Sequence, residues 1–245
     1  MLDRQTDRQT DRQTDRQTDR QTDRQTDSGF WHKSDLNSRL GFTLAEVLLV
    51  ITIIGIVASL TIPGLITSVQ DQQWKSAWKK NYSVISQAME NYKLTNNTET
   101  IAGALFLYPD TVTSELSKYF NAIKLCQYTD GCWNNLNYDY SNNPSVSNPA
   151  TRTSLVLNDG TLMKVTIVNP SCIGIDNWLT DICAIVWVDV NGFKSPNTIG
   201  KDIYGAWLLK NRTLPLGSGR DSYNPATNCQ TPNNGWGCST QALTQ

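Results

Sequence analysis

The chain has 245 residues and a formal net charge of −1, with 39% hydrophobic and 18% charged residues. Eight basic and eight acidic residues precede Phe42, so the remainder carries 13 Lys plus Arg against 14 Asp plus Glu. This balance leaves no basic excess for nucleic acid, and we predict no nucleic-acid partner. A repetitive leader and an apolar segment leave about 150 residues for a globular part, which suits one modest domain.

The chain begins with a leader that we place at residues 1–41. Residues 3–26 consist of six copies of Asp-Arg-Gln-Thr. The repeat has no apolar side chain to bury, so we expect it to be disordered. Translation from Met1 and a non-standard start at Leu36, which would leave a leader of six residues, are both consistent with the sequence.

An uncharged run follows the leader at residues 47–66. At about 1.5 Å per helical residue, these 20 residues span the roughly 30 Å hydrocarbon core of a bilayer. We therefore predict a single transmembrane helix over residues 42–66. Lys33 and Arg39 lie before it, which favours a cytoplasmic amino end. Glu46 stands at the edge of this run, where a carboxylate needs a partner and indicates a function.

The stretch Gly41-Phe42-Thr43-Leu44-Ala45-Glu46 and the apolar residues after it resemble the cleavage and methylation motif of type IV pilins and type II secretion pseudopilins. The resemblance implies that prepilin peptidase cuts between Gly41 and Phe42 and that the new Phe42 amine is N-methylated. It also implies that Glu46 pairs with the Phe42 amine of a neighbouring subunit during assembly, which satisfies a buried carboxylate. Leu40 separates Arg39 from Gly41, whereas many members place the basic residue directly before the glycine.

The same resemblance implies a structural filament subunit of a type IV pilus or a type II secretion pseudopilus. It would be a single-pass protein of the bacterial inner membrane, with its head in the periplasm or on an extracellular filament. The expected partners are prepilin peptidase, other pilin or pseudopilin subunits, an inner-membrane assembly platform and membrane lipid. The alternative is a minor tip pilin that acts as a binding or adhesion module through aromatic residues in loop-like sequence: Trp133, Tyr138, Tyr140 and Trp236. Covering a small local core is an equally open interpretation of each of these residues.

Beyond the membrane segment, apolar residues recur at spacings near three and four. This pattern predicts an amphipathic continuation of the helix over residues 67–94, on which a head at residues 95–245 packs. Pro63 lacks the amide hydrogen that an interior helix position needs, so we expect a bend or local melting there. The apolar residues of this pattern are Leu65, Val69, Trp78, Tyr82, Ile85, Met89 and Tyr92.

The head sequence predicts an α+β fold in which the long N-terminal helix packs on a small antiparallel sheet, and the resemblance implies the same pilin-like fold. Asp110 suits the N-cap of a short helix that extends to Ile123, and residues 134–149 read as a surface loop. Asn158-Asp159-Gly160 is a hairpin turn signal. We expect three or four strands, at residues 154–157, 162–168, 184–190 and 203–209.

All six cysteines lie beyond the membrane segment, which suits disulfides in an oxidising compartment. Fifteen pairings are open in principle, and pairing between sequence neighbours is the simplest: Cys126 with Cys132, Cys172 with Cys183, and Cys229 with Cys238. No C-x-x-C pair occurs, and the single histidine, His32, lies in the leader, so we predict no structural zinc. Beyond the leader there is no histidine, no G-x-S-x-G and no phosphate loop, so we predict that the protein is not an enzyme and needs no cofactor.

One polar segment has two open interpretations. Asp189-Val190-Asn191-Gly192, followed by Ser195-Pro196-Asn197 and Gly200-Lys201-Asp202, resembles a stretch that recurs in the heads of bacterial pilin-like proteins. Some secretion pseudopilins bind calcium in a carboxyl-side loop, and the segment offers oxygen ligands, although its spacing is not that of an EF-hand. An Asn-Gly turn capped by short polar side chains explains the same residues. The calcium candidates are Asp189, Asn191, Asn197 and Asp202.

Overall fold

A computed structural model describes residues 41–106, 108–127, 131–134, 136–139, 141–146, 153–230 and 232–245. The predicted leader repeat, Lys33, Leu36 and Arg39 lie outside these residues. The chain divides into two compact units, residues 1–54 and 55–245, which are described separately.

The helix α2 begins at Leu44 and ends at Thr95. It passes through Pro63 without a break, so of the two predicted outcomes, a bend or local melting, the melting is wrong. A proline removes one backbone donor, and the rest of this long helix keeps its own hydrogen bonds. The apolar part of α2 is long and hydrophobic enough to cross a membrane, with a mean hydropathy of 2.4 over its best window, in which no residue is buried within the protein.

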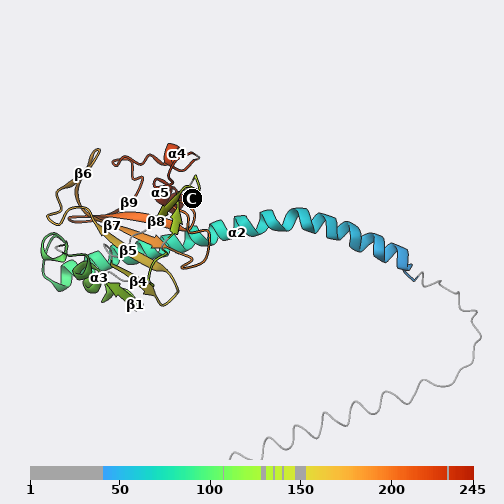
Figure 1. Cartoon of the computed structure of the whole chain (residues 1–245), viewed down its shortest axis with the longest axis horizontal. Helices are drawn as coiled ribbons and strands as arrows, with labels where there is room; N and C mark the ends of the chain where they lie inside the picture. Colours follow the sequence, from blue (N-terminus) through green and yellow to red (C-terminus); the bar gives the residue numbers. More distant parts are fainter. Residues whose placement is uncertain are drawn as a thin grey trace, which may run out of the picture. The chain divides into compact units, whose positions relative to one another are not determined.

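In the second unit, α2 packs on an antiparallel sheet (Figure 1). The strand order is β1-β4-β5-β7-β8-β9, and β6 pairs with β7 as a seventh strand. A separate two-stranded sheet joins β2 to β3. The strands are β1 (Ala122–Gln127), β2 (Leu136–Tyr138), β3 (Pro144–Val146), β4 (Thr153–Leu157), β5 (Leu162–Ile167), β6 (Gly174–Asp176), β7 (Leu179–Asp189), β8 (Ile203–Leu209) and β9 (Thr213–Pro215).

Four short helical segments complete the described part of the head: η1 (Ala104–Phe106), α3 (Pro109–Ser117), α4 (Pro225–Asn228) and α5 (Cys238–Thr244). The N-cap of α3 is Tyr108, so the predicted capping role of Asp110 is wrong, and Asp110 lies in the first helical turn. Pro109 explains the shift, because its fixed φ and missing donor suit the first helical position. Ile123 lies in β1 rather than in this helix.

The α+β fold is as predicted, but the sheet has more strands than expected. The four predicted strands correspond to β4, β5, β7 and β8, whereas β1, β6 and β9 were not predicted. Two of the missed strands, β6 and β9, have three residues each, too few to show an alternating pattern. The missed edge strand β1 exposes Ile123, Lys124 and Leu125 in succession, so it lacks the alternation of a half-buried strand.

One face of the sheet packs against α2 and α3 in a single hydrophobic core. Alternate residues of β7 (Ala184, Val186 and Val188) point into this core, as strand periodicity requires. On α2, Trp78, Ile85 and Met89 of the predicted apolar pattern are buried, but Leu65 and Val69 are exposed. The core on this face includes Trp78, Ile85, Met89, Val112, Leu116, Leu155, Met163, Val165, Tyr204, Ala206 and Leu208.

The other face of the sheet carries a second core, covered by loops and the C-terminal segment. Trp187 meets Trp236 edge-on with ring centroids 4.9 Å apart, and Trp207 stacks on Tyr223 at 6.3 Å. Gly205 lies beneath these rings, and a Cβ atom there would come within 2.4 Å of Leu216 Cδ1. A side chain at this position would therefore require the buried Leu216 side chain to shift.

The C-terminal segment is ordered by more than its disulfide. Trp78 Nε1 donates a hydrogen bond to the Ser239 carbonyl oxygen at 2.9 Å, and the Gly205 amide donates to Ser239 Oγ at 2.9 Å. Ser239 thus joins α5 to α2 and to the centre of the sheet. Sequence periodicity does not report tertiary hydrogen bonds of this kind.

Trp78 is fully buried and stacks on Tyr204 at 5.4 Å, so Trp78→Ala should lower the free energy of unfolding by about 3–5 kcal/mol. Urea unfolding of the detergent-solubilised full chain, followed by near-UV circular dichroism, measures the change. Trp178→Ala is the matched control, because Trp178 is 80% exposed and its loss should cost about 0.5 kcal/mol or less. Equal effects of the two substitutions would contradict the packing described here.

Candidate functional site

The predicted processing and assembly residues lie together at the start of α2, in the first unit. Gly41 and Phe42 precede the helix, and both are exposed. Glu46 is the acidic residue of the first turn. A carboxylate at this position is favourable because it faces the unpaired amides at the positive end of the helix dipole.

Thr43 and Glu46 form a capping box. The Thr43 amide and hydroxyl donate to Glu46 Oε2 at 2.8 and 2.9 Å, and the Glu46 amide donates to Thr43 Oγ1 at 3.2 Å. The sequence signal for this arrangement is Thr-x-x-Glu before an apolar run. Thr43 was not among the predicted site residues. Both Thr43 bonds end on Oε2, so the box orients the Glu46 carboxylate within one subunit and leaves Oε1 for an intermolecular partner.

The six cysteines form three disulfides between sequence neighbours. Cys126 pairs with Cys132, Cys172 with Cys183, and Cys229 with Cys238. No free cysteine occurs in the described residues. Cys172 and Cys183 are fully buried in the core beneath α2, and their bridge closes the base of the β6–β7 hairpin. Each bridge therefore fixes a local loop.

The calcium candidates meet at the turn between β7 and β8. Asp189 ends β7, Asp202 directly precedes β8, and both are fully buried. Asp202 accepts hydrogen bonds from the amides of Asn197 and Thr198 at 2.8 and 2.6 Å. These bonds organise the turn as the polar-turn interpretation expects. The described residues contain no group of three His, Cys, Asp or Glu that could hold a metal ion, so the acidic ligands here are two.

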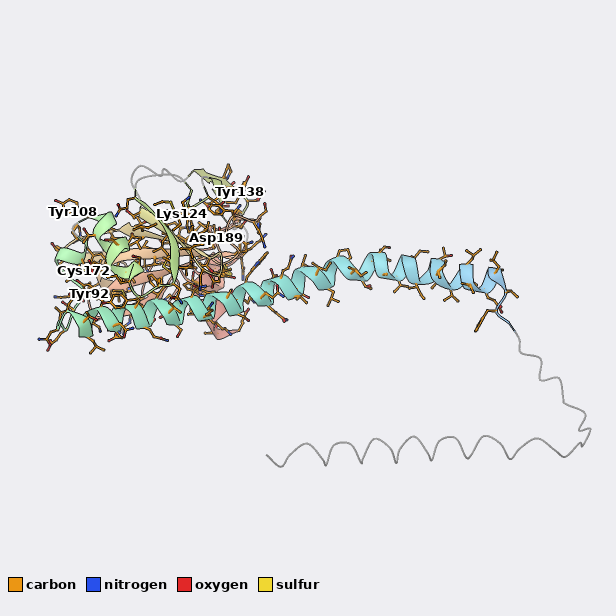
Figure 2. All side chains as sticks on the ribbon, turned by 90° about the horizontal axis from the view of Figure 1, so that it is seen from below. Tyr92, Tyr108, Lys124, Tyr138, Cys172 and Asp189 are labelled. Carbon is orange, nitrogen blue, oxygen red and sulfur yellow. A yellow bond between two sulfur atoms is a disulfide. The ribbon has the colours of Figure 1, made fainter. Side chains whose placement is uncertain are left out.

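Asn134 is a member of this cluster that the sequence did not indicate. Its Nδ2 lies 3.0 Å from Asp189 Oδ2, 3.1 Å from the Gly192 carbonyl oxygen and 2.6 Å from Asn197 Oδ1. Asn134 is 55 residues from Asp189 in the chain, and no spacing rule links them. The contact is made because β2 docks on the turn, where the Tyr138 amide donates to the Asn197 carbonyl oxygen at 2.9 Å. Figure 2 labels Tyr138 of β2 and Asp189 of the turn on the same part of the head.

The two carboxyl groups of this cluster are electrostatically perturbed. Burial, reinforced by the charge of Asp202, raises the pKa of Asp189 to about 8. Burial also raises the pKa of Asp202 above its ordinary value. Among the described residues, Asp189 Oδ1 and Asn191 Oδ1 are buried without a hydrogen-bond partner. We use the name acidic turn for Asp189, Asp202 and the polar groups of Asn134, Asn191 and Asn197 around them.

Two of the aromatic residues proposed for binding, Trp133 and Trp236, pack against the head. Trp133 is buried, with Lys164 Nζ 4.3 Å from its ring centroid, and Trp236 packs in the second core. Of the two interpretations, covering a local core holds for Trp133, and Trp236 is half-buried against the second core. Tyr138 is half-buried, and Tyr140 lies outside the described residues. Both tryptophans cover parts of the sheet that would otherwise expose apolar side chains to water.

Three of the most exposed apolar side chains in the described part of the head lie at the β6–β7 hairpin. Ile173, Ile175 and Trp178 are 69%, 70% and 80% exposed. The Trp178 amide donates to the Arg220 carbonyl oxygen at 2.9 Å, which fixes the tip of the hairpin. The sequence did not single out these residues. Whether a short hairpin is exposed depends on which other segments of the chain pack on it, and local sequence does not show this.

A long apolar helix whose second part packs on a small antiparallel sheet defines a pilin-like α+β protein with a membrane anchor. Residues 36–62 match the family model of the prokaryotic N-terminal methylation motif, which is the signature of type IV pilins and pseudopilins. The match includes Gly41, Phe42 and Glu46. It points to a structural protein that a prepilin peptidase processes and that assembles with other pilins.

The searches of curated proteins and of solved structures found no match to the chain.

The buried Cys172–Cys183 bridge gives a stability prediction. The double variant Cys172→Ala/Cys183→Ala should lower the free energy of unfolding by about 2–4 kcal/mol, because the denatured chain regains the freedom of the closed loop. Thermal unfolding of the detergent-solubilised full chain measures the loss. The Cys126–Cys132 bridge closes a shorter loop, so the matched double variant Cys126→Ala/Cys132→Ala should lower the free energy of unfolding by less. The opposite ranking would contradict this account.

Proposed function

We propose that the protein is a structural subunit of a type IV pilus or a type II secretion pseudopilus. The observation that carries the proposal is the methylation motif at residues 36–62, which begins a helix whose apolar side chains are exposed. Such side chains need lipid before assembly and neighbouring helices afterwards. Residues 42–66 would anchor the subunit in the inner membrane with its amino end in the cytoplasm, and the disulfide-bonded head would face the periplasm or the filament surface.

Processing would occur between Gly41 and Phe42, on the cytoplasmic side of the membrane. Both residues precede the helix and are exposed, so the backbone between them is not held in helical hydrogen bonds. Peptidases bind extended backbone, which a preformed helix would deny them. Cleavage would leave Phe42 as the N-methylated first residue, directly before the Thr43–Glu46 capping box.

Gly41→Leu should block processing, because a large side chain would stand where the peptidase accepts glycine. Intact-mass and amino-terminal peptide spectrometry on protein from its own membranes should find N-methylated Phe42 in the unmodified chain and an uncleaved precursor in the variant. Leu44→Ile, a conservative change within the same motif, is the control and should be processed normally. An unmodified chain that still begins upstream of Gly41 would contradict the proposal.

Assembly would use Glu46 as the partner of the Phe42 amine in a neighbouring subunit. Glu46→Gln keeps the shape of the side chain and an oxygen for the capping box but removes the charge. The variant should be processed and inserted normally, yet its amount in sheared filaments should fall at least about tenfold. Glu90→Gln is the matched control, since Glu90 is an exposed residue of the same helix that pairs with Lys93 at 2.7 Å. Equal loss in both variants would contradict the assigned role.

A minor tip pilin that acts as a binding or adhesion module is the second candidate. The exposed Ile173, Ile175 and Trp178 favour it, because apolar side chains on a projecting hairpin suit contact with a partner. Abundance distinguishes the candidates: a major subunit dominates sheared filaments, whereas a tip subunit is scarce. Immunogold labelling along the filament or only at its end would decide between them.

A further inference from the structure

We propose that the Cys229–Cys238 disulfide is a site of thiol–disulfide exchange in the folded head, open to the reactive cysteine of a dithiol oxidoreductase. Cys229 is the C-cap of α4 and Cys238 begins α5, two short helices of the C-terminal segment (Figure 1). This role does not depend on processing at Gly41 or on assembly through Glu46.

The three bridges differ in how easily a thiol can reach them. The four cysteines of the other two bridges are all 2% exposed or less. Cys238 is buried to the same degree, but Cys229 is only half-buried. Exchange requires a thiolate to reach one of the two sulfurs, so access decides which bridge reacts. The Cys229 sulfur is therefore the one open to attack.

A cavity of about 200 Å³ provides a route to this bridge. Its walls come from α2, the turn before β8 and the C-terminal segment, and both Cys229 and Cys238 line it. Three of its polar residues, Asp71, Lys201 and Gln245, are exposed, so the cavity opens to solvent. A thiol can therefore approach the bridge while the head remains folded.

The polar lining of the cavity suits the reaction, because the attacking and the leaving groups are both thiolates. A thiolate in apolar surroundings loses its hydration without compensation. The Cys172–Cys183 bridge lies in such surroundings, in the hydrophobic core beneath α2. The cavity beside the C-terminal bridge instead presents charged and amide side chains: Asp71, Lys75, Lys201, Gln241 and Gln245.

Hydrogen bonds hold the chain on both sides of this bridge. After Cys238, Ser239 accepts hydrogen bonds from α2 and from the sheet, each at 2.9 Å. Before Cys229, Asn224 caps α4, and its side-chain oxygen accepts from the Ala226 amide at 2.9 Å. Reduction would therefore loosen the loop between the two cysteines and leave the rest of the head folded.

The exchange would occur in two steps. The thiolate of the oxidoreductase attacks Cys229 Sγ, which forms a mixed disulfide and expels Cys238 as a thiolate that takes a proton from water. The second thiol of the oxidoreductase loses its proton and attacks its own sulfur in the mixed disulfide, which releases Cys229 as a thiolate that is protonated in turn. The oxidoreductase leaves as a disulfide, and two electrons have passed from it to the head.

The first test uses the full chain in detergent with all three bridges intact. Dithiothreitol is added under native conditions, free thiols are alkylated at intervals, and the chain is digested with trypsin. Each bridge lies within a tryptic peptide of its own, at residues 125–152, 165–194 and 221–245. The peptide 221–245 should be alkylated first, and the other two should react at least about tenfold more slowly. Far-UV circular dichroism should not change when only this bridge is reduced.

The second test uses a protein dithiol. Thioredoxin whose second active-site cysteine is replaced by serine stops at the mixed disulfide, and peptide mass spectrometry should find it on Cys229. The double variant Cys229→Ser/Cys238→Ser should form no adduct. The matched double variant Cys126→Ser/Cys132→Ser should form the adduct as the unmodified chain does. Far-UV circular dichroism confirms that each variant is folded.

Three results would overturn the proposal. The first is alkylation of another bridge before Cys229–Cys238 or together with it, which would mean that thiols enter only when the head unfolds. The second is loss of the far-UV signal as Cys229–Cys238 is reduced, which would mean that this bridge holds the fold. The third is the lack of a thioredoxin adduct on the unmodified chain, or an adduct that persists in Cys229→Ser/Cys238→Ser, since either would mean that a protein thiol does not reach this bridge.

Discussion

The packing of α2 on the sheet is the interaction on which the rest of the head depends. The helix contributes the buried Trp78, Ile85 and Met89 to a core that also holds the inward residues of β4, β5, β7 and β8. Trp78 extends this contact to the C-terminal segment, because its indole nitrogen bonds to the Ser239 carbonyl. The helix is therefore apolar enough to cross a membrane in one part and, together with α3, covers this face of the sheet in the other.

The elements that the sequence predicted correctly were those whose apolar residues recur with a clear helical or strand periodicity. The helical spacing of Trp78, Ile85 and Met89 and the strands on either side of Asn158-Asp159-Gly160 have short-range signals, and the structure contains them. Pro63 was predicted to bend or locally melt the helix, because it removes one hydrogen bond. The helix does not melt there, since its continuity depends on all the neighbouring hydrogen bonds. The short strand β6 pairs with the first residues of β7, where β5 does not pair, and β9 pairs with β8 at the edge of the sheet; three-residue strands of this kind leave no alternating pattern in the sequence.

The candidate sites also divide into residues that are close in the chain, which the sequence indicated, and residues that only the fold brings together. Gly41, Phe42 and Glu46 are adjacent in the chain, so a motif was enough to indicate them. Asp189 and Asp202 were indicated by a local run of polar residues, but Asn134 joins them only through the docking of β2 on the turn. The aromatic residues show most clearly that side-chain exposure could not be predicted from the local sequence. Trp133 and Trp236 lie in loop-like sequence yet are covered, while Trp178 lies in a strand-rich region and is exposed. Exposure depends on neighbours that are distant in the chain.

The three disulfides close short loops, with sequence separations of 6, 11 and 9 residues, and none of them includes a residue of α2. Covalent bonds therefore reinforce the sheet, the β6–β7 hairpin and the C-terminal segment separately, while the seam between helix and sheet is held by side-chain packing and hydrogen bonds. Under tension along the helix, that seam is the mechanical weak point of the head. The loops would stay crosslinked while the sheet peeled from the helix, so oxidation protects the parts of the head without adding to its resistance to pulling.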